Sequence, residues 1–185
     1  MRKNFGVKSW FYPQPVLIIA TYDENGNPDA MNAAWGGLYD GNKVELCLSA
    51  GHKTTKNIQA TGAFTVSFAD AANVVASDYV GLASANTEPN KMEKSGFHLT
   101  KSQFVNAPLI DELPVAMECK LVKINEDGNV IGEIVNVSAD ESVLGEDGNI
   151  DFSKFRPISF EPVHNGYHVL GERVGNAFQD GAALK

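Results

Sequence analysis

Short apolar segments that end at glycine-containing turns limit this chain to a mainly β fold. Val16–Tyr22 is β-branched and apolar, and it stops at a polar turn where Asn25-Gly26 readily takes the positive φ of a hairpin. Residues 29–34 would return as the partner strand, and residues 43–49 would form a third strand. The first third of the chain therefore predicts an antiparallel meander.

The same pattern continues downstream. Residues 63–69 alternate, with Phe64, Val66 and Phe68 on one face. Residues 115–124 and 130–138 flank a second glycine-containing turn and predict a long hairpin. Six or more strands are about the number that a small closed barrel requires.

Helical patterns are few and short. Residues 54–60 predict a helix that Thr61-Gly62 ends, and Asp70 is expected to cap a second helix that stops near Gly81. Residues 83–98 predict an irregular surface segment with one helical turn, and long irregular loops are often functional. The fold class expected is mainly β, with an antiparallel barrel-like sheet and a few short flanking helices.

Length and charge indicate the number of domains and exclude some classes of partner. A chain of 185 residues has room for one substantial core, so we expect a single domain over residues 1–185. A net charge of −8 argues against nucleic-acid partners, because phosphate-backbone binding requires clustered Lys and Arg. No apolar stretch approaches the roughly 18 to 20 residues of a membrane span, and a cytoplasmic location without membrane partners is expected.

The sequence lacks the motifs of several common kinds of catalytic site. The nucleophile motif G-x-S-x-G and the phosphate-binding motif G-x-x-x-x-G-K-[S/T] do not occur, which disfavours hydrolases and nucleotide triphosphatases. His164 and His168 are separated by Asn-Gly and have no third ligand nearby, so no metal site is predicted. Cys47 and Cys119 each lie in an apolar segment and are expected to be small buried hydrophobic residues.

Residues 53–57, Lys-Thr-Thr-Lys-Asn, form the strongest candidate for an anion site. They would lie where a strand leads into a helix, and the free N–H groups and dipole of a helix N-terminus favour a phosphate. Taken alone, the same residues also fit a surface helix capped by Thr54 or Thr55 with two solvated lysines. His52 would contact the phosphate or lie at the surface.

Residues 32–37, Asn-Ala-Ala-Trp-Gly-Gly, form a second candidate. Small residues allow close approach, and backbone amides with the carboxamide of Asn32 would suit a planar heterocycle. The alternative is an ordinary strand whose Trp35 packs in the core. The residues themselves leave both alternatives open.

Several motifs in a fixed order carry a resemblance to a known family. They are Tyr12–Ile18, Asp23-x-x-Gly26-x-Pro28, Ala30–Gly37, Lys53-Thr54-Thr55-x-Asn57, Gly81–Ser84, Ile131–Ile134, Leu144–Gly148 and Tyr167-His168-x-x-Gly171 with Gly175-x-Ala177-Phe178. Together they resemble the flavin reductase-like family of FMN-binding split barrels, and within it the flavoredoxin group. The order of the segments is more specific than any one of them.

That resemblance implies an antiparallel split β-barrel that forms a homodimer and binds FMN near the subunit interface. By this likeness the isoalloxazine would lie along Asn32, Ala33, Ala34 and Trp35, and the phosphate would be held by Ser49, Ala50, Lys53, Thr54, Thr55 and Asn57. Ser84 and Lys91 would close over the flavin, with Lys91 a candidate for its N1–O2 edge. Many relatives carry arginine near Lys53, and lysine would hold phosphate as a point charge.

The implied activity is that of an NAD(P)H-dependent flavin reductase, in which FMN takes a hydride at N5 and passes electrons on. No catalytic acid or base and no metal is expected. The alternative is a flavoredoxin-like carrier whose tightly bound FMN is reduced by a redox protein, without nicotinamide activity. A third hypothesis is a barrel that binds another ligand such as haem, because one fold can serve several functions.

Overall fold

The computed structural model describes residues 1–185, which form twelve strands and five short helices. The strands are β1 Gln14–Pro15, β2 Leu17–Tyr22, β3 Pro28–Ala33, β4 Gly36–Asp40, β5 Lys43–Leu46, β6 Ala63–Phe68, β7 Leu99–Lys101, β8 Pro108–Ile110, β9 Val115–Ile124, β10 Val130–Ala139, β11 Ile158–Glu161 and β12 Gly166–Val169. The α-helices are α1 Lys53–Thr61, α2 Val74–Leu82 and α3 Lys91–Ser95, and the 3-10 helices are η1 Glu141–Val143 and η2 Asp180–Leu184.

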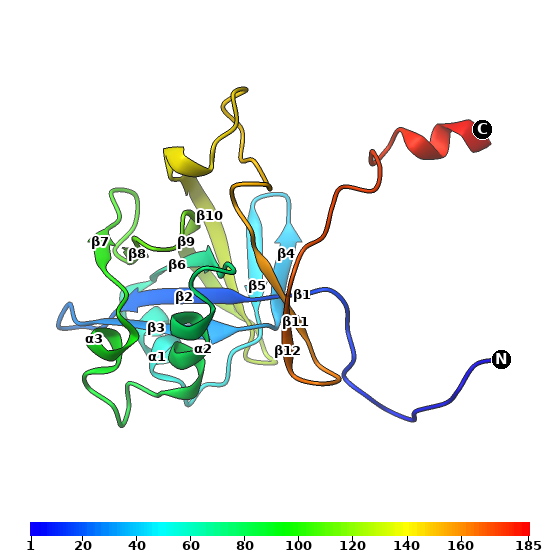
Figure 1. The fold of residues 1–185 in the computed structure, drawn as a ribbon. Helices are drawn as coiled ribbons and strands as arrows, with labels where there is room; N and C mark the ends of the chain where they lie inside the picture. The colour runs from blue at the N-terminus through cyan, green and yellow to red at the C-terminus, as the bar shows by residue number, and fades with distance from the viewer.

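One curled antiparallel sheet dominates the molecule (Figure 1). Its seven strands run in the order β3-β2-β6-β9-β10-β5-β4. The two edge strands, β3 and β4, are consecutive in the chain and are joined only by Ala34 and Trp35. Residues 34 and 35 therefore lie at the place where the sheet stays open, and the prediction of a mainly β, antiparallel split β-barrel with short flanking helices is confirmed.

The alternation of side chains along β2 divides the core into two clusters. Leu17 and Ile19 join one cluster with Phe64 and other residues of the curled sheet. Ile18 joins a second cluster on the opposite face, where Val80 of α2 also packs. Successive residues of a strand point to opposite faces, so a strand buried on both sides reads as one continuous apolar run.

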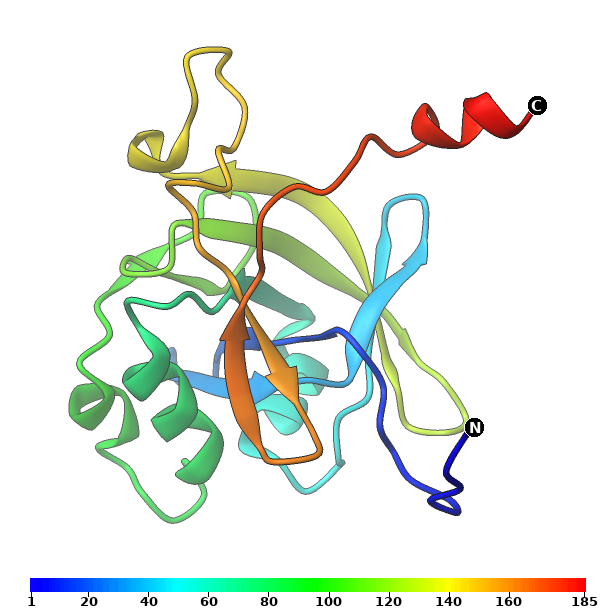
Figure 2. The same ribbon diagram turned by 45° about the vertical axis from the view of Figure 1, so that its right-hand side comes forward.

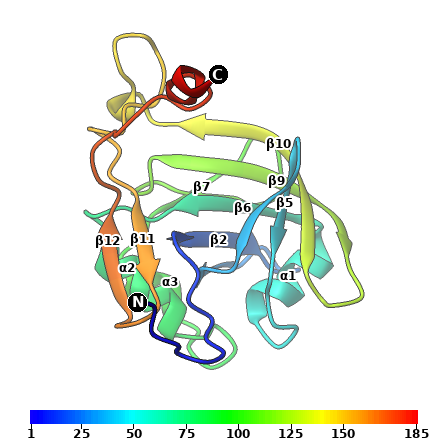
Figure 3. The same ribbon diagram turned by 90° about the vertical axis from the view of Figure 1, so that its right-hand side faces the viewer.

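Helices pack on both faces of β2, because Ile58 of α1 belongs to the cluster of Leu17 and Ile19 whereas Val80 of α2 belongs to that of Ile18. Figure 1 shows α2 and α3 beside β2 and β3, and Figure 3 shows β11 and β12 of the small sheet β1-β11-β12 on the side of α2. α2 and α3 both contact β3. This arrangement brings the loops that follow α2 to the strand that carries Asn32.

Several sequence predictions are confirmed within one to three residues. These are the β2–β3 hairpin, the helix that ends at Gly62, the strand at 63–68, the turn of helix inside 83–98 and the β9–β10 hairpin. Gly26 and Gly62 have φ of 81° and 70°, the left-handed conformation that glycine adopts without strain. The hairpin turn and the helix end therefore depend on glycine, as predicted.

Three expectations are corrected. Cys47 is exposed, because β5 ends at Leu46 and the thiol lies just beyond the strand; Cys119 is buried as expected. Asp70 is not the N-cap residue of α2, which is Asn73, although Asp70 Oδ1 accepts the N–H groups of Ala72 and Asn73 at 3.1 and 2.9 Å. The strand predicted at 43–49 is shorter, since it stops at Leu46.

No helix in the structure is long and apolar enough to cross a membrane. The sequence patterns did not predict β1, β4, β7, β8, β11 or β12.

Candidate functional site

The N-terminus of α1 presents backbone N–H groups that no protein group uses. The N-cap residue His52 has an extended backbone (φ −66°, ψ 142°) and makes no side-chain capping bond. The N–H groups of Lys53, Thr54 and Thr55 donate no hydrogen bond within the chain. Three free donors at the positive end of a helix dipole favour an anion.

The alternative role for Thr54 and Thr55 was to cap the helix, and neither side chain does so. Thr54 Oγ1 donates to Asp29 Oδ2 at 2.7 Å, and Thr55 Oγ1 donates to the carbonyl oxygen of Ser49 at 2.9 Å. Both side chains are buried. They therefore fix the start of α1 against β3 and against the loop before the helix, and the backbone amides stay free.

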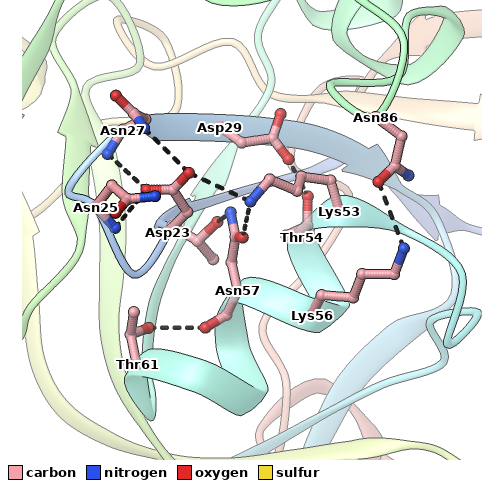
Figure 4. Close-up of polar contacts among 11 residues, drawn as sticks. Asp23, Asn25, Asn27, Asp29, Lys53, Thr54, Lys56, Asn57, Thr61 and Asn86 are labelled. Atoms are coloured by element: carbon pink, nitrogen blue, oxygen red, sulfur yellow. Dashed lines mark hydrogen bonds and ion pairs between the residues drawn. The ribbon is translucent and has the colours of Figure 1, made fainter. Parts of the chain in front are cut away.

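Lys53 is held at the same end of α1. Its Nζ donates to Asn57 Oδ1 at 2.7 Å and lies 3.4 Å from Asp23 Oδ2, and its side chain is 29% exposed (Figure 4). The N–H of Asn27 is the main cause that lowers the pKa of Asp23 to about 2. Asp23 is therefore ionised at neutral pH, and it holds the lysine beside the helix start.

A buried ion pair lies under the site. Lys91 Nζ is 3.1 Å from Asp29 Oδ1, and each side chain is only 3% exposed. The other oxygen of Asp29 accepts the hydroxyl of Thr54, so one carboxylate connects α3, β3 and α1. A buried carboxylate with two partners forms a rigid junction, because losing either partner would leave charge uncompensated.

A hollow of about 170 Å³ lies between α1, β3 and the loop after α2. Five of the twelve predicted site residues line it, namely Asn32, Lys53, Thr54, Ser84 and Lys91. The other lining residues are His52, the small residues at 81, 83 and 85, and Asp29, Met31, Val80 and Leu82. Segments that are distant in sequence are thus brought together around the free amides of α1.

Asn32 uses its carboxamide within the protein. Its Nδ2 donates to the carbonyl oxygen of Ser77 in α2 at 2.9 Å. A Cβ at Gly81 would lie 2.9 Å from Asn32 Cβ, so only glycine lets α2 pack this closely. Asn32 therefore positions α2 and its following loop against the end of β3.

A second and larger hollow, of about 590 Å³, lies at the split of the sheet. It is lined by Ala34, Trp35 and the two glycines at 36 and 37, together with residues 8–11 of the N-terminal segment and Cys47. Trp35 is 58% exposed, so the alternative that it packs in the core is wrong. The backbone N–H of Cys47 bonds the carbonyl oxygen of Trp35 at 2.9 Å and fixes the chain at the split.

The remaining predicted residues lie around these hollows without lining them. Ala33 is half-buried at the end of β3, and Ser49 and Ala50 are exposed in the loop before α1. Thr55 and Asn57 are buried, and Asn57 Nδ2 donates to Thr21 Oγ1 at 3.0 Å. Their side chains shape the start of α1 from within.

Asp23 and Asp29, which contact Lys53 and Thr54, were not among the predicted site residues. Asp29 offered one signal, which is a carboxylate at an inward position of a strand that carries mostly small and apolar residues. Asn86 also went unnoticed; its Nδ2 bonds the carbonyl oxygen of Gly51, and its Oδ1 accepts from Lys56 Nζ at 3.5 Å (Figure 4). It connects the loop after α2 to the loop before α1.

Fold and site together define a split β-barrel with a short helix, packed on β2 and β3, whose first backbone amides are free. The family model described as "flavin reductase like domain" matches residues 9–159. The chain therefore belongs to the flavin reductase-like domain family.

Solved structures give the same result. The chain is 36% identical to flavoredoxin of Desulfovibrio vulgaris (Miyazaki F), covering 98% of this chain and 100% of that one, with a TM-score of 0.94. It is 25% identical to flavoredoxin from Methanosarcina acetivorans over 100% of both chains, with a TM-score of 0.90. An FMN-binding domain of a flavin reductase-like enzyme from Shewanella baltica, at 21% identity over 88% of this chain and 89% of that chain and a TM-score of 0.78, has the same fold.

Proposed function

We propose that this protein binds FMN and transfers electrons through it. The observation that carries the proposal is the set of three free N–H groups at the start of α1, beside Lys53 and at one wall of the smaller hollow. A phosphate there would receive hydrogen bonds from the backbone and charge from the lysine. The membership of the family and the likeness to flavoredoxins support the same cofactor.

The residues between the two hollows fit a flat heterocycle. Asn32 lines the smaller hollow, Ala34 and Trp35 line the larger one, and Ala33 lies between them. Three residue steps separate Asn32 from Trp35 and span at most roughly 10 Å, since an extended residue adds about 3.3 Å. Small side chains over this length would let a ring system lie against the backbone, with its far end beside Trp35.

Bound FMN supplies the chemistry, because its ring system accepts and donates electrons and hydride. The protein's own groups would bind and orient it. Lys53 and the amides of α1 would hold the phosphate, Thr54 and Asp29 would keep those amides in place, and Trp35 would cover the ring end. No side chain in either hollow is required to act as acid or base.

The electron-carrier function is supported best. The chain is 36% identical to a flavoredoxin over nearly the whole length of both chains. In that function another redox protein would reduce the bound flavin, and no nicotinamide site would be needed.

Nicotinamide-dependent flavin reduction is the second candidate, and one observation favours it. The hollow beside Trp35 holds about 590 Å³ and is open, so a planar donor could approach the ring end from solvent. Both functions predict a yellow protein as purified. Anaerobic addition of NADH and NADPH separates them, since bleaching of the flavin bands would indicate reductase activity and unchanged bands would indicate a carrier.

A colourless protein that takes up no added FMN would contradict both functions and favour a different ligand. Lys53→Ala combined with Thr54→Ala offers a direct test of the phosphate site. The variant should lose at least tenfold in FMN affinity, because the cation and the anchor of the helix start are both removed. Unchanged FMN affinity would contradict the assignment of the phosphate site.

A further inference from the structure

Tyr167 of β12 is a half-buried residue that the flavin site described above does not use. Figure 2 shows the hairpin of β11 and β12 in orange, beside the green helices. The hydroxyl of Tyr167 donates a hydrogen bond to Asp78 Oδ1 of α2 at 2.7 Å. Its ring packs against Phe160 of β11, with 6.0 Å between the ring centroids. Tyr167 therefore connects the small sheet to α2.

Asp78 determines the direction in which the hydroxyl of Tyr167 points. An ionised carboxylate can only accept a hydrogen bond, so the single phenol proton is directed to Asp78 and the Tyr167 oxygen is left as an acceptor. Burial, together with the hydrogen bond and the charge of Asp78, raises the pKa of Tyr167 to about 12. The phenol therefore keeps its proton well above neutral pH, and the direction of this bond is fixed.

The carboxamide of Asn32 is oriented by the same two elements. Asn32 Nδ2 donates to the carbonyl oxygen of Ser77 in α2 at 2.9 Å. A carbonyl oxygen can only accept, so the nitrogen of the carboxamide must face α2. The Asn32 side chain also lies against the Tyr167 oxygen as a donor, since it lowers the pKa of Tyr167 against the larger effects of burial and Asp78. Both N–H groups of the carboxamide are thus directed towards α2 and β12.

Close packing prevents the opposite orientation of Asn32. A Cβ at Gly81 would lie 2.9 Å from Asn32 Cβ, which shows how closely α2 lies on β3. A half-turn of the carboxamide would place its oxygen against the carbonyl oxygen of Ser77 with no proton between them, which is unfavourable. Oδ1 is therefore the polar atom of Asn32 that stays free, at a residue that lines the smaller hollow.

We infer that Tyr167 and Asp78 are positioning residues that turn Asn32 Oδ1 towards the flavin, as the acceptor for the N3–H of its ring. The inference rests on the FMN function proposed above. An oxidised isoalloxazine has one ring N–H, at N3, so a fixed acceptor beside the ring selects the edge that carries N3. Neither Tyr167 nor Asp78 lines either hollow, so both act through Asn32 and not on the flavin itself.

The test compares FMN with 3-methyl-FMN, in which a methyl group replaces the hydrogen at N3. Isothermal titration of the wild type should show roughly tenfold weaker binding of the methylated flavin, because Asn32 Oδ1 loses its donor. Tyr167→Phe keeps the ring that packs on Phe160 and removes the oxygen that orients Asn32. The affinity ratio of the two flavins should fall by about threefold or more, and losses common to both flavins cancel in this ratio.

A second variant and a control make the test specific. Asp78→Ala frees the phenol proton of Tyr167 to turn towards Asn32, so it should lower the ratio as well. Tyr79→Phe is the control, because it removes a hydroxyl from the same helix that takes no part in these contacts, and it should keep the wild-type ratio. Without flavin, the Nδ2 proton resonances of Asn32 should shift in Tyr167→Phe and stay in place in Tyr79→Phe.

Each contradicting outcome has its own meaning. Wild-type ratios in both Tyr167→Phe and Asp78→Ala would show that these residues support the fold without orienting Asn32. Equal affinity of the wild type for both flavins would show that Asn32 Oδ1 does not receive the N3–H. Failure of both flavins to bind the wild type would contradict the proposed FMN function, and the inference with it.

Discussion

Lys91 Nζ lies 3.1 Å from Asp29 Oδ1 in a position where both side chains are 3% exposed. The pair connects α3 to β3, and Asp29 also accepts the hydroxyl of Thr54 at the start of α1. Three elements of the proposed FMN site therefore meet at one carboxylate. Charge at this depth is costly without a partner, so the two residues depend on each other.

Replacing Lys91 by methionine should destabilise the protein by about 3 kcal/mol, because the change leaves Asp29 buried without its cation. Urea unfolding would measure the loss as a lower midpoint with an unchanged slope. Adding Asp29→Asn should restore part of the stability, since the uncompensated charge is then removed.

Lys94→Met is the matched control. Lys94 pairs with Glu88 at 2.7 Å, a shorter distance than in the buried pair, yet it lies at the surface with 54% of its side chain exposed. Solvent screens such pairs, so little change in the unfolding midpoint is expected. Equal losses in the two variants would show that burial of the Lys91–Asp29 pair is not the source of its effect.

Gly132→Ala should destabilise the sheet by about 1–3 kcal/mol through overpacking. A Cβ at Gly132 in β10 would overlap the ring of Phe64, which is fully buried at the centre of the curled sheet. Gly41→Ala is the control, because a Cβ there would meet nothing within 4 Å. Thermal unfolding of both variants checks the prediction, and a Gly132→Ala variant as stable as the control would contradict the packing described.

The two thiols should differ in reactivity. Burial raises the pKa of Cys119 to about 12, and burial with the nearby Glu45 charge also raises the pKa of Cys47. Alkylation at pH 8 followed by mass spectrometry should modify Cys47 slowly, and Cys119 only after unfolding. Labelling of Cys119 in the native protein at a rate equal to Cys47 would contradict its burial.

The raised pKa of Cys119 also sets a pH dependence of stability. The unfolded thiol ionises near its ordinary pKa of 9, while the folded one resists ionisation up to about 12. The unfolded state therefore loses its proton first, and stability should fall as the pH rises from 9 towards 12. Cys119→Ala should remove this part of the alkaline loss, whatever its cost near neutral pH.

Local patterns predicted those parts of the fold that local chemistry determines. The Asn25-Gly26 turn and the helix end at Gly62 were predictable because each needs a residue that tolerates positive φ, and glycine marks both. The short strand β4 was not predictable, since Gly36-Gly37 is typical of a turn in the sequence and forms a strand only through its pairing with β5. Residues outside such signals take their structure from tertiary contacts.

The site residues likewise divide into those that local sequence patterns predict and those that depend on tertiary contacts. Lys53 and Thr54 were predicted because a helix start follows a strand, and Asn32 was predicted from the small residues after it. Their partner Asp29 was missed, since its ion pair joins positions 62 residues apart. The burial of Thr54 and Asn57 and the exposure of Trp35 also depend on contacts that no local pattern records.

The central claim is that the free amides of α1 hold the phosphate of FMN, and His52→Asp tests it most directly. The carboxylate of an aspartate at this N-cap position would accept hydrogen bonds from the free N–H groups of α1 and would stabilise the helix by about 1 kcal/mol. Its negative charge would also repel a phosphate at the same place. Isothermal titration with FMN and with riboflavin, which lacks the phosphate, distinguishes a loss of phosphate binding from a loss of flavin-ring binding. His52→Ala is the control. We expect stability to rise, FMN affinity to fall at least tenfold and riboflavin affinity to stay unchanged. Unchanged FMN affinity in His52→Asp, or an equal loss for both flavins, would contradict the claim.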